Sequence, residues 1–246
     1  MKNAVKKTHA VLSSSSYKIS SESSFDYVES YNQLRTNVMF SLAALCSSKK
    51  AIIVSSAHPS ECKSTVSANL AISLAKLKQK VLVIDADLRR PNLHRIFGVH
   101  NERGLSDVIL SSSVDNAIIG IGGLNLDFLP AGTIPPNPSE LLGSAAVAEL
   151  ISTLEKIYDY IIIDTPPILV VSDALMLSRV AAGMLISCRY KKTTYNDFDK
   201  VLNALNLAKF SVIGAVIVGS KKGDDLRMIG KHNGYGYSYC NKITDK

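Results

Sequence analysis

Residues 52–71 read IIVSSAHPSECKSTVSANLA, and this stretch decides the fold. An apolar, β-branched run comes first, a short polar turn follows, and a segment of helical character begins near Ser64. This strand–loop–helix order is the context that a Walker A phosphate loop requires. Backbone N–H groups of such a loop point at phosphate oxygens, and the helix dipole favours their negative charge. The residues predicted to bind the phosphates are Ser60, Glu61, Cys62, Lys63, Ser64 and Thr65.

The loop departs from the pattern G-x-x-x-x-G-K-[ST] at its glycines. Ala57 and Cys62 take the two glycine positions, and Ser60 stands where such loops commonly carry a third. Glycine is favoured there because the backbone needs unusual dihedral angles and approaches the phosphate closely. A residue with a side chain at positive φ costs roughly 1 kcal/mol or more. Taken alone, the segment fits an ordinary strand–helix turn as well as it fits a phosphate loop.

Two acidic motifs further along the chain favour the phosphate loop. In VLVIDADLRRP, Asp85 and Asp87 follow an apolar run, and YIIID ends on Asp164. Ligands of open α/β sheets bind at the carboxyl ends of strands. Two carboxylates two residues apart suit Mg²⁺ binding and general-base work, and an acid after an apolar strand is typical of Walker B. Each Asp alone could cap a helix, but the three signals in this order indicate nucleotide binding.

The alternation of apolar runs and helical segments predicts an α/β fold. We expect a mostly parallel central sheet with helices on both faces, because the strand runs are almost continuously hydrophobic. The expected strands are residues 51–55, 80–84, 126–130, 160–164, 183–189 and 213–218. The expected helices are residues 26–46, 64–77, 139–142, 145–157, 172–179 and 196–208.

The 246 residues, of which 46% are hydrophobic, suffice for one large α/β domain. We predict a disordered, basic, serine-rich arm at residues 1–24, a P-loop domain at 25–220, and a flexible tail at 221–246. Part of the net charge of +7 lies in the arm, which we interpret as a solvated tail and not as a nucleic-acid site. No stretch approaches the roughly 20 apolar residues of a membrane span. Any membrane role would therefore come through a partner or the membrane surface. The four cysteines fit no metal or disulfide pattern, and free thiols favour the reducing cytoplasm.

Several motifs together resemble the bacterial tyrosine kinases of the CapB/CpsD type, which act in capsule and exopolysaccharide export. The resemblance covers about residues 26–240. PSECKSTVSANLA resembles the family's Walker A, VLVIDADLRRP its second aspartate motif, and IIIDTPP its Walker B. PAGTIPPNPSELL at residues 130–142 is similar to a long family segment unrelated to phosphates, and ESYNQLRTNV at 29–38 resembles an oligomerisation helix. In that helix Asn32 replaces the first arginine of the motif.

The resemblance implies an ATP- and Mg²⁺-dependent protein-tyrosine autokinase. Lys63 would neutralise phosphate charge, and Asp85 would accept the tyrosine proton beside Asp87. It implies a membrane-spanning modulator that activates the kinase from its cytoplasmic segment, a ring of subunits, tyrosine-containing protein substrates, and a place at the inner face of the cell membrane. The implied metal ligands are Ser64, Asp85, Asp87 and Asp164, the implied phosphorylation sites are Tyr235, Tyr237 and Tyr239, and the implied ring contacts are Glu29 and Arg35.

Two other functions stay open at this point. A positioning ATPase of the MinD/ParA type shares the fold, but its signature lysine would stand where this chain has His58. A catalytically impaired scaffold of the same polysaccharide complex is the second, because the loop lacks its glycines.

Overall fold

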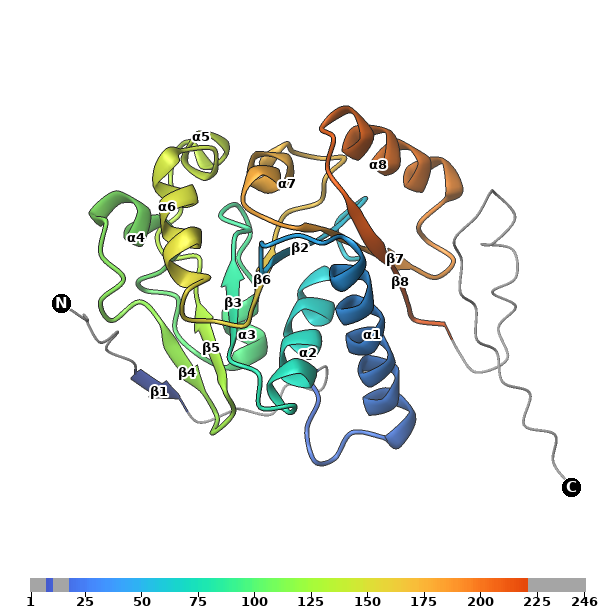
Figure 1. Cartoon of the computed structure of the whole chain (residues 1–246), viewed down its shortest axis with the longest axis horizontal. Coiled ribbons are helices and arrows are strands. Elements are labelled where there is room, and N and C mark those ends of the chain that lie inside the picture. Colours follow the sequence, from blue (N-terminus) through green and yellow to red (C-terminus); the bar gives the residue numbers. More distant parts are fainter. Residues whose placement is uncertain (1–7, 11–17, 221–246) are drawn as a thin grey trace, which may run out of the picture.

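A computed structural model describes residues 18–220 and, as backbone, residues 8–10. Its centre is an eight-stranded sheet in the order β1-β4-β5-β3-β6-β2-β7-β8 (Figure 1). Every neighbouring pair is parallel except β4 and β5, which are antiparallel. The strands are β1 (Thr8–Ala10), β2 (Ala51–Ser56), β3 (Val81–Asp85), β4 (Ile119–Ile121), β5 (Leu126–Leu129), β6 (Tyr160–Asp164), β7 (Gly183–Arg189) and β8 (Val212–Val218).

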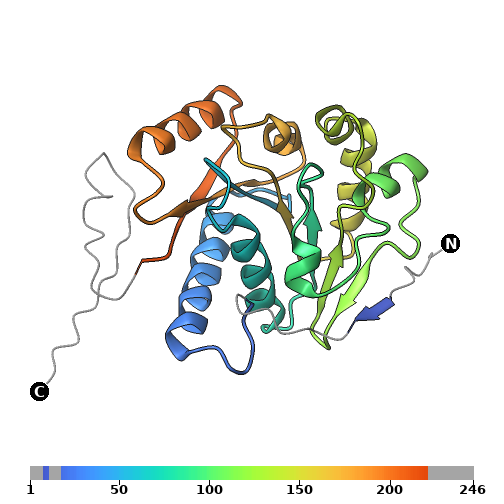
Figure 2. The same cartoon turned by 180° about the vertical axis from the view of Figure 1, so that it is seen from behind.

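Helices cover both faces of the sheet, as the two views show (Figures 1 and 2). One layer holds α1 (Phe25–Ala44), α2 (Lys63–Ala75) and α3 (Leu93–Phe97). The other layer holds α4 (Leu105–Ser111), α5 (Pro138–Leu142), α6 (Ala145–Leu154), α7 (Asp173–Met176) with the 3-10 turn Leu177–Arg179, and α8 (Tyr195–Leu207). The predicted α/β fold is confirmed.

Alternate side chains of each central strand pack into two separate hydrophobic cores, one on each face of the sheet. In β2, Ile52 packs with α1 and α2, whereas Ile53 packs with the layer of α6 and α8. In β3, Val83 and Ile84 divide in the same way. A strand buried on both faces needs apolar side chains at every position. This explains why the central strands read as unbroken hydrophobic runs.

The segment that begins with Pro130 is shaped by a glycine. Gly132 has φ +80°, and a Cβ there would lie 2.1 Å from the Asp107 carboxylate. Asp107 accepts hydrogen bonds from the N–H groups of Gly104 and Thr133, at 2.9 and 3.2 Å. The first part of PAGTIPPNPSELL therefore docks on the N-terminus of α4.

The structure differs from the predicted disordered arm at residues 8–10 and 18–24. Residues 8–10 pair with β4, and this backbone pairing adds a strand to the edge of the sheet. Ile19 is buried, and its N–H donates to the side-chain oxygen of Asn69 on α2 at 2.8 Å. The Asn69 side-chain Nδ2 donates to the Tyr27 hydroxyl at 2.9 Å. Asn69 thus fastens the entry to α1 onto α2.

Within the described residues, no helix has both the length and the apolarity needed to cross a bilayer. The predicted tail, with Tyr235, Tyr237 and Tyr239, lies outside the described part of the chain.

Replacing Asn69 by alanine should lower the free energy of unfolding by about 2 kcal/mol, because the Ile19 N–H and the Tyr27 hydroxyl lose a buried partner. Urea denaturation measures the change. The control is Asn206→Ala on the exposed face of α8, which should stay within about 0.5 kcal/mol of wild type. Equal effects of the two substitutions would contradict the docking of residues 18–24.

Candidate functional site

Three neighbouring strands bring the predicted site residues to one edge of the sheet. β3, β6 and β2 lie side by side, and Asp85 pairs in register with Asp164 at their carboxyl ends. Val54 of β2 also pairs with Asp164, and Ser64 at the start of α2 donates to the Asp164 carboxylate. Residues far apart in the sequence therefore meet where open α/β sheets bind ligands.

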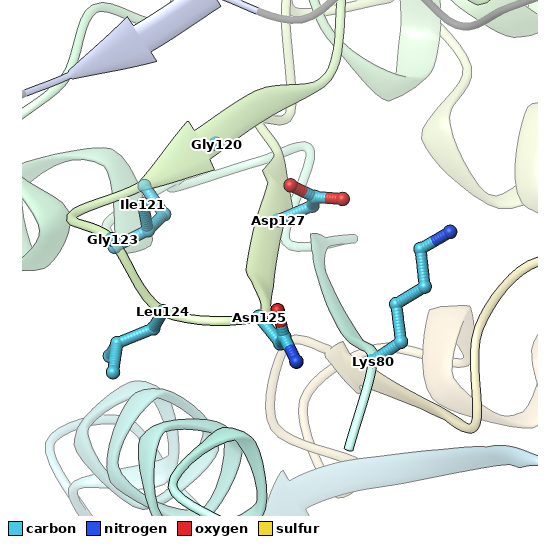
Figure 3. Close-up of a pocket in the computed structure, with 7 residues that line it drawn as sticks. All are labelled: Lys80, Gly120, Ile121, Gly123, Leu124, Asn125 and Asp127. Atoms are coloured by element: carbon cyan, nitrogen blue, oxygen red, sulfur yellow. The ribbon is translucent and has the colours of Figure 1, made fainter. Parts of the chain in front are cut away.

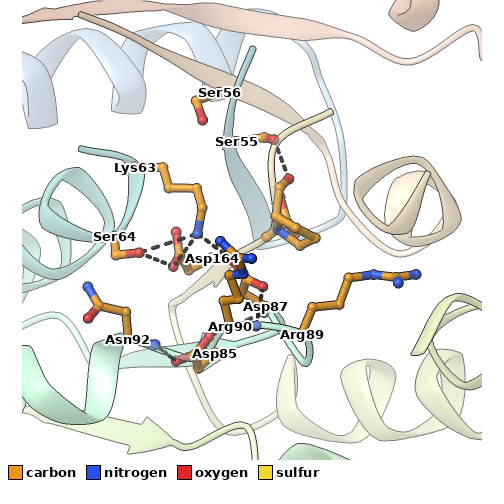
Figure 4. A network of polar contacts seen from close by, with 12 residues as sticks. Ser55, Ser56, Lys63, Ser64, Asp85, Asp87, Arg89, Arg90, Asn92 and Asp164 are labelled. Atoms are coloured by element: carbon orange, nitrogen blue, oxygen red, sulfur yellow. Dashed lines mark hydrogen bonds and ion pairs between the residues drawn. The ribbon is translucent and has the colours of Figure 1, made fainter. Parts of the chain in front are cut away.

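Lys63 lies between two carboxylates of this edge (Figure 4). Its Nζ is 2.9 Å from Asp87 Oδ2 and 3.4 Å from Asp164 Oδ2. Burial lowers the pKa of Lys63, but attraction by Asp164 and Asp87 outweighs burial and raises it. Lys63 is therefore cationic. The Ser64 hydroxyl donates to Asp164 Oδ2 at 2.6 Å, and the Ser67 hydroxyl donates to Oδ1 at 3.0 Å.

Asp85 is fully buried beneath the turn that carries Asp87. It accepts backbone N–H groups from Asp87 at 3.2 Å and from Asn92 and Leu93 at 3.1 Å. Burial and the neighbouring charge of Asp164 raise the pKa of Asp85 to about 7, although Lys63 and the Leu93 N–H act in the opposite direction. A carboxylate has about four lone-pair positions, so one acceptor position remains.

The phosphate loop adopts the left-handed conformation that glycine favours. Ser60 has φ 63° and Cys62 has φ 62°, whereas Ala57 lies outside the left-handed region. The expectation of glycine-type dihedral angles is confirmed at positions 60 and 62 and is wrong at position 57. Cys62 precedes α2, and no described side chain caps that helix start. The first N–H groups of α2 are therefore available to an anion.

The donor set fits a nucleotide phosphate and Mg²⁺. The hard oxygen donors are the Ser64 hydroxyl and the carboxylates of Asp87 and Asp164, which Mg²⁺ prefers. Among the described residues, no three His, Cys, Asp or Glu side chains are grouped so as to hold a metal by themselves. Mg²⁺ usually takes one or two carboxylates together with substrate phosphates and water.

A second ion pair, which the sequence did not reveal, supports the Asp87 turn. Arg89 donates to the buried Asp173 through Nε at 2.8 Å and through Nη2 at 3.1 Å. Ser139 donates to the same carboxylate at 2.6 Å. Ser139 belongs to the segment 130–142, so that segment is tied to the acidic turn. The resemblance of the segment was visible in the sequence, but its partner on α7 was not.

The predicted ring contacts on α1 interact with their own chain. Arg35 Nη1 donates to the Ser73 carbonyl at 3.0 Å and to Asn32 Oδ1 at 3.1 Å. Glu29 Oε2 accepts from Asn32 Nδ2 at 3.1 Å. Asn32, at the position of the missing arginine, therefore links Glu29 and Arg35 within one subunit.

A cavity of about 290 Å³ lies elsewhere, at the amino ends of β3 and β5 (Figure 3). Two of its polar groups already have partners in the fold. Asn125 Nδ2 donates to the Lys78 carbonyl at 3.1 Å, and Asp127 accepts from the Tyr158 hydroxyl at 2.8 Å. None of the predicted site residues lines this cavity, because they lie at the carboxyl ends of the strands. The remaining lining residues are Lys80, Gly120, Ile121, Gly123 and Leu124.

Known proteins match both the sequence and the fold. Residues 49–212 match the family model described as an AAA domain. The chain is 41% identical over 210 residues to the tyrosine-protein kinase YwqD of Bacillus subtilis (strain 168), covering 85% of each protein. The kinase domain of the Escherichia coli tyrosine kinase ETK has a TM-score of 0.75 and 34% identity, covering 86% of this chain and 80% of that structure.

A more distant match is the septum site-determining protein MinD from Pyrococcus horikoshii OT3, complexed with Mg-ADP. It has a TM-score of 0.58 and 26% identity, covering 68% of this chain and 69% of that structure. The predicted resemblance to bacterial tyrosine kinases and to MinD-like P-loop proteins is confirmed.

Replacing Cys62 by glycine should raise the free energy of unfolding by about 1 kcal/mol, because glycine accepts the positive φ without strain. Urea denaturation without nucleotide measures the change. Ser152→Gly, at an exposed position inside α6, is the control and should lose about 0.5 kcal/mol. A destabilised Cys62→Gly protein would show that the loop is not strained at this position.

Proposed function

The chain belongs to the family of bacterial tyrosine-protein kinases, and we propose that it transfers the γ-phosphoryl group of ATP to protein tyrosines. Asp85 and Lys63 would serve this transfer, which would control capsule or exopolysaccharide synthesis. The observation that carries these roles is Lys63 held between Asp87 and Asp164, with the hydroxyl of Ser64 on the same carboxylate. An ammonium, a hydroxyl and acidic groups at the start of a helix are the parts that phosphoryl transfer requires.

The binding roles follow from position along the loop. Residues 60–65 would surround the phosphates with their N–H groups, and Lys63 would turn from the carboxylates to the transferred phosphoryl group. Ser64, Asp85, Asp87 and Asp164 would hold Mg²⁺. Mg²⁺ supplies neutralisation of charge on the phosphate oxygens.

Asp85 is the proposed base. The tyrosine hydroxyl would give its proton to Asp85 while its oxygen takes the phosphoryl group and ADP leaves. A pKa near the working pH suits this duty, because the group must accept a proton from the substrate and then release it.

The acceptors and partners follow from the family resemblance. Tyr235, Tyr237 and Tyr239 are the proposed autophosphorylation sites, and other tyrosine-containing proteins are the proposed further substrates. A membrane-spanning modulator would hold the protein at the inner face of the cell membrane. Subunits would associate into a ring near Glu29 and Arg35, where contact with a second chain would replace or share the bonds that these residues make with Asn32.

Of the two alternatives, the positioning ATPase has less support. Identity to MinD is 26%, against 41% to YwqD. At the position of the signature lysine, His58 Nε2 lies 3.1 Å from Asp197 of its own chain. The scaffold remains as an outcome of the test below.

The test compares phosphotyrosine on wild-type protein, Lys63→Ala and Lys76→Ala after incubation with Mg²⁺-ATP. Lys76 is exposed at the end of α2, so its loss should change nothing. Lys63→Ala should reduce phosphotyrosine by at least about 100-fold, the typical effect of removing a group that stabilises transition-state charge. Circular dichroism checks that both variants fold. Wild-type protein without phosphotyrosine, even with the modulator added, would instead identify a scaffold.

A further inference from the structure

The loop of residues 58–61 is held from outside by the segment that joins β7 to α8. Two exposed cations, one in this segment and one at the end of β7, donate to loop carbonyls. Lys192 Nζ donates to the Pro59 oxygen at 2.8 Å, and Arg189 Nη1 donates to the Ser60 oxygen at 3.0 Å. These carbonyls belong to the two residues that precede Glu61 in the loop.

Glu61 is the centre of these contacts. It is only 1% exposed, and its Oε1 accepts the hydroxyl hydrogen of Thr193. Its Oε2 accepts the N–H of His58 at 2.9 Å, which closes the loop on itself. The Ser187 hydroxyl of β7 donates to the Glu61 carbonyl. A buried carboxylate needs such donors, because its desolvation is costly without them.

The joining segment is itself fixed. Thr193 Oγ1 accepts the N–H of Arg189 at 2.8 Å, so its hydroxyl is directed at Glu61. Thr194 and Asp197 cap α8 through hydrogen bonds in both directions, and Asp197 also pairs with His58. The anchor of the phosphate loop is therefore the start of a packed helix.

The backbone of the phosphate loop is strained on both sides of Glu61, and the contacts of Glu61 stabilise it. Ser60 and Cys62 hold positive φ values on either side of Glu61. Residues in such conformations persist only when the surrounding structure over-determines them. The hydrogen bonds of Glu61 stabilise the strained conformation, because they hold the residue that lies between the two strained positions.

We propose that Thr193, through Glu61, is a positioning residue that keeps the glycine-poor phosphate loop in its nucleotide-binding conformation. Thr193 would touch no phosphate and would act through Glu61 alone. The inference rests on the proposed function in one respect, namely that the loop binds a nucleotide. Loss of Thr193 should therefore weaken nucleotide binding and raise the KM for ATP, while the kcat of the enzyme stays near the wild-type value.

The experiment uses the full chain with Thr193→Val, which keeps the shape and removes the hydroxyl, and Thr193→Ser, which restores the hydroxyl. Thr153→Val, at an exposed position on α6, is the matched control. Hydrogen–deuterium exchange of residues 57–65 is measured without nucleotide, and ADP affinity is measured by calorimetry. Thr193→Val should speed exchange in the loop and weaken ADP binding, each roughly tenfold, as expected from one lost hydrogen bond to a charged group. Thr193→Ser and Thr153→Val should match wild type.

The exchange measurement separates this inference from the proposed function. Unchanged loop exchange in a folded Thr193→Val protein would overturn the inference, whether or not ADP binds. If wild type binds no ADP but Thr193→Val still speeds loop exchange, the positioning of the loop stands and the proposed function fails. If Thr193→Val speeds exchange throughout the chain, Glu61→Gln takes its place, because it keeps the size of the side chain and weakens the acceptor to which Thr193 and His58 donate. Faster exchange confined to the loop would then support the anchor, and no change would overturn it.

Discussion

The ion pairs of Lys63 with Asp87 and Asp164 are the interaction on which the site depends. They join the first turn of α2 to the ends of β3 and β6, three segments that are remote in sequence. Burial alone would favour neutral lysine, but the two carboxylates outweigh burial and keep the ammonium charged. The three carboxyl groups around this lysine supply oxygen ligands of the kind that Mg²⁺ takes beside a phosphate chain.

The central fold could be predicted from the sequence because its strands are buried on both faces. Continuous apolar runs located β2, β3, β6 and β7 to within a residue or two. The sequence did not reveal β1, β4, α3 or α4, which are short and rely on contacts made elsewhere in the chain. At the N-terminus of α4, for example, Asp107 accepts the N–H of Thr133, a residue 26 positions away in the chain.

The site residues also fall into those that the sequence could predict and those that it could not. Lys63, Ser64 and the three aspartates were visible because local motifs place each of them at a strand end or helix start. Thr193 and Arg89 were not, since their partners lie 132 and 84 positions away in the chain. The missing glycines are understood only with both kinds of information. Sequence predicts strain at residues 60 and 62, and the structure adds the buried Glu61 that holds the loop between them.

The most direct test of the account is calorimetric titration of the purified wild-type chain with Mg²⁺-ATP, with a Ser60→Gly, Cys62→Gly double variant alongside. We expect wild type to bind in the micromolar range, because the loop already has the left-handed residues that a phosphate loop needs. The double variant should bind at least as tightly. If wild type does not bind and the double variant does, the side chains at positions 60 and 62 block the phosphates, and this loop is no nucleotide site in the natural chain.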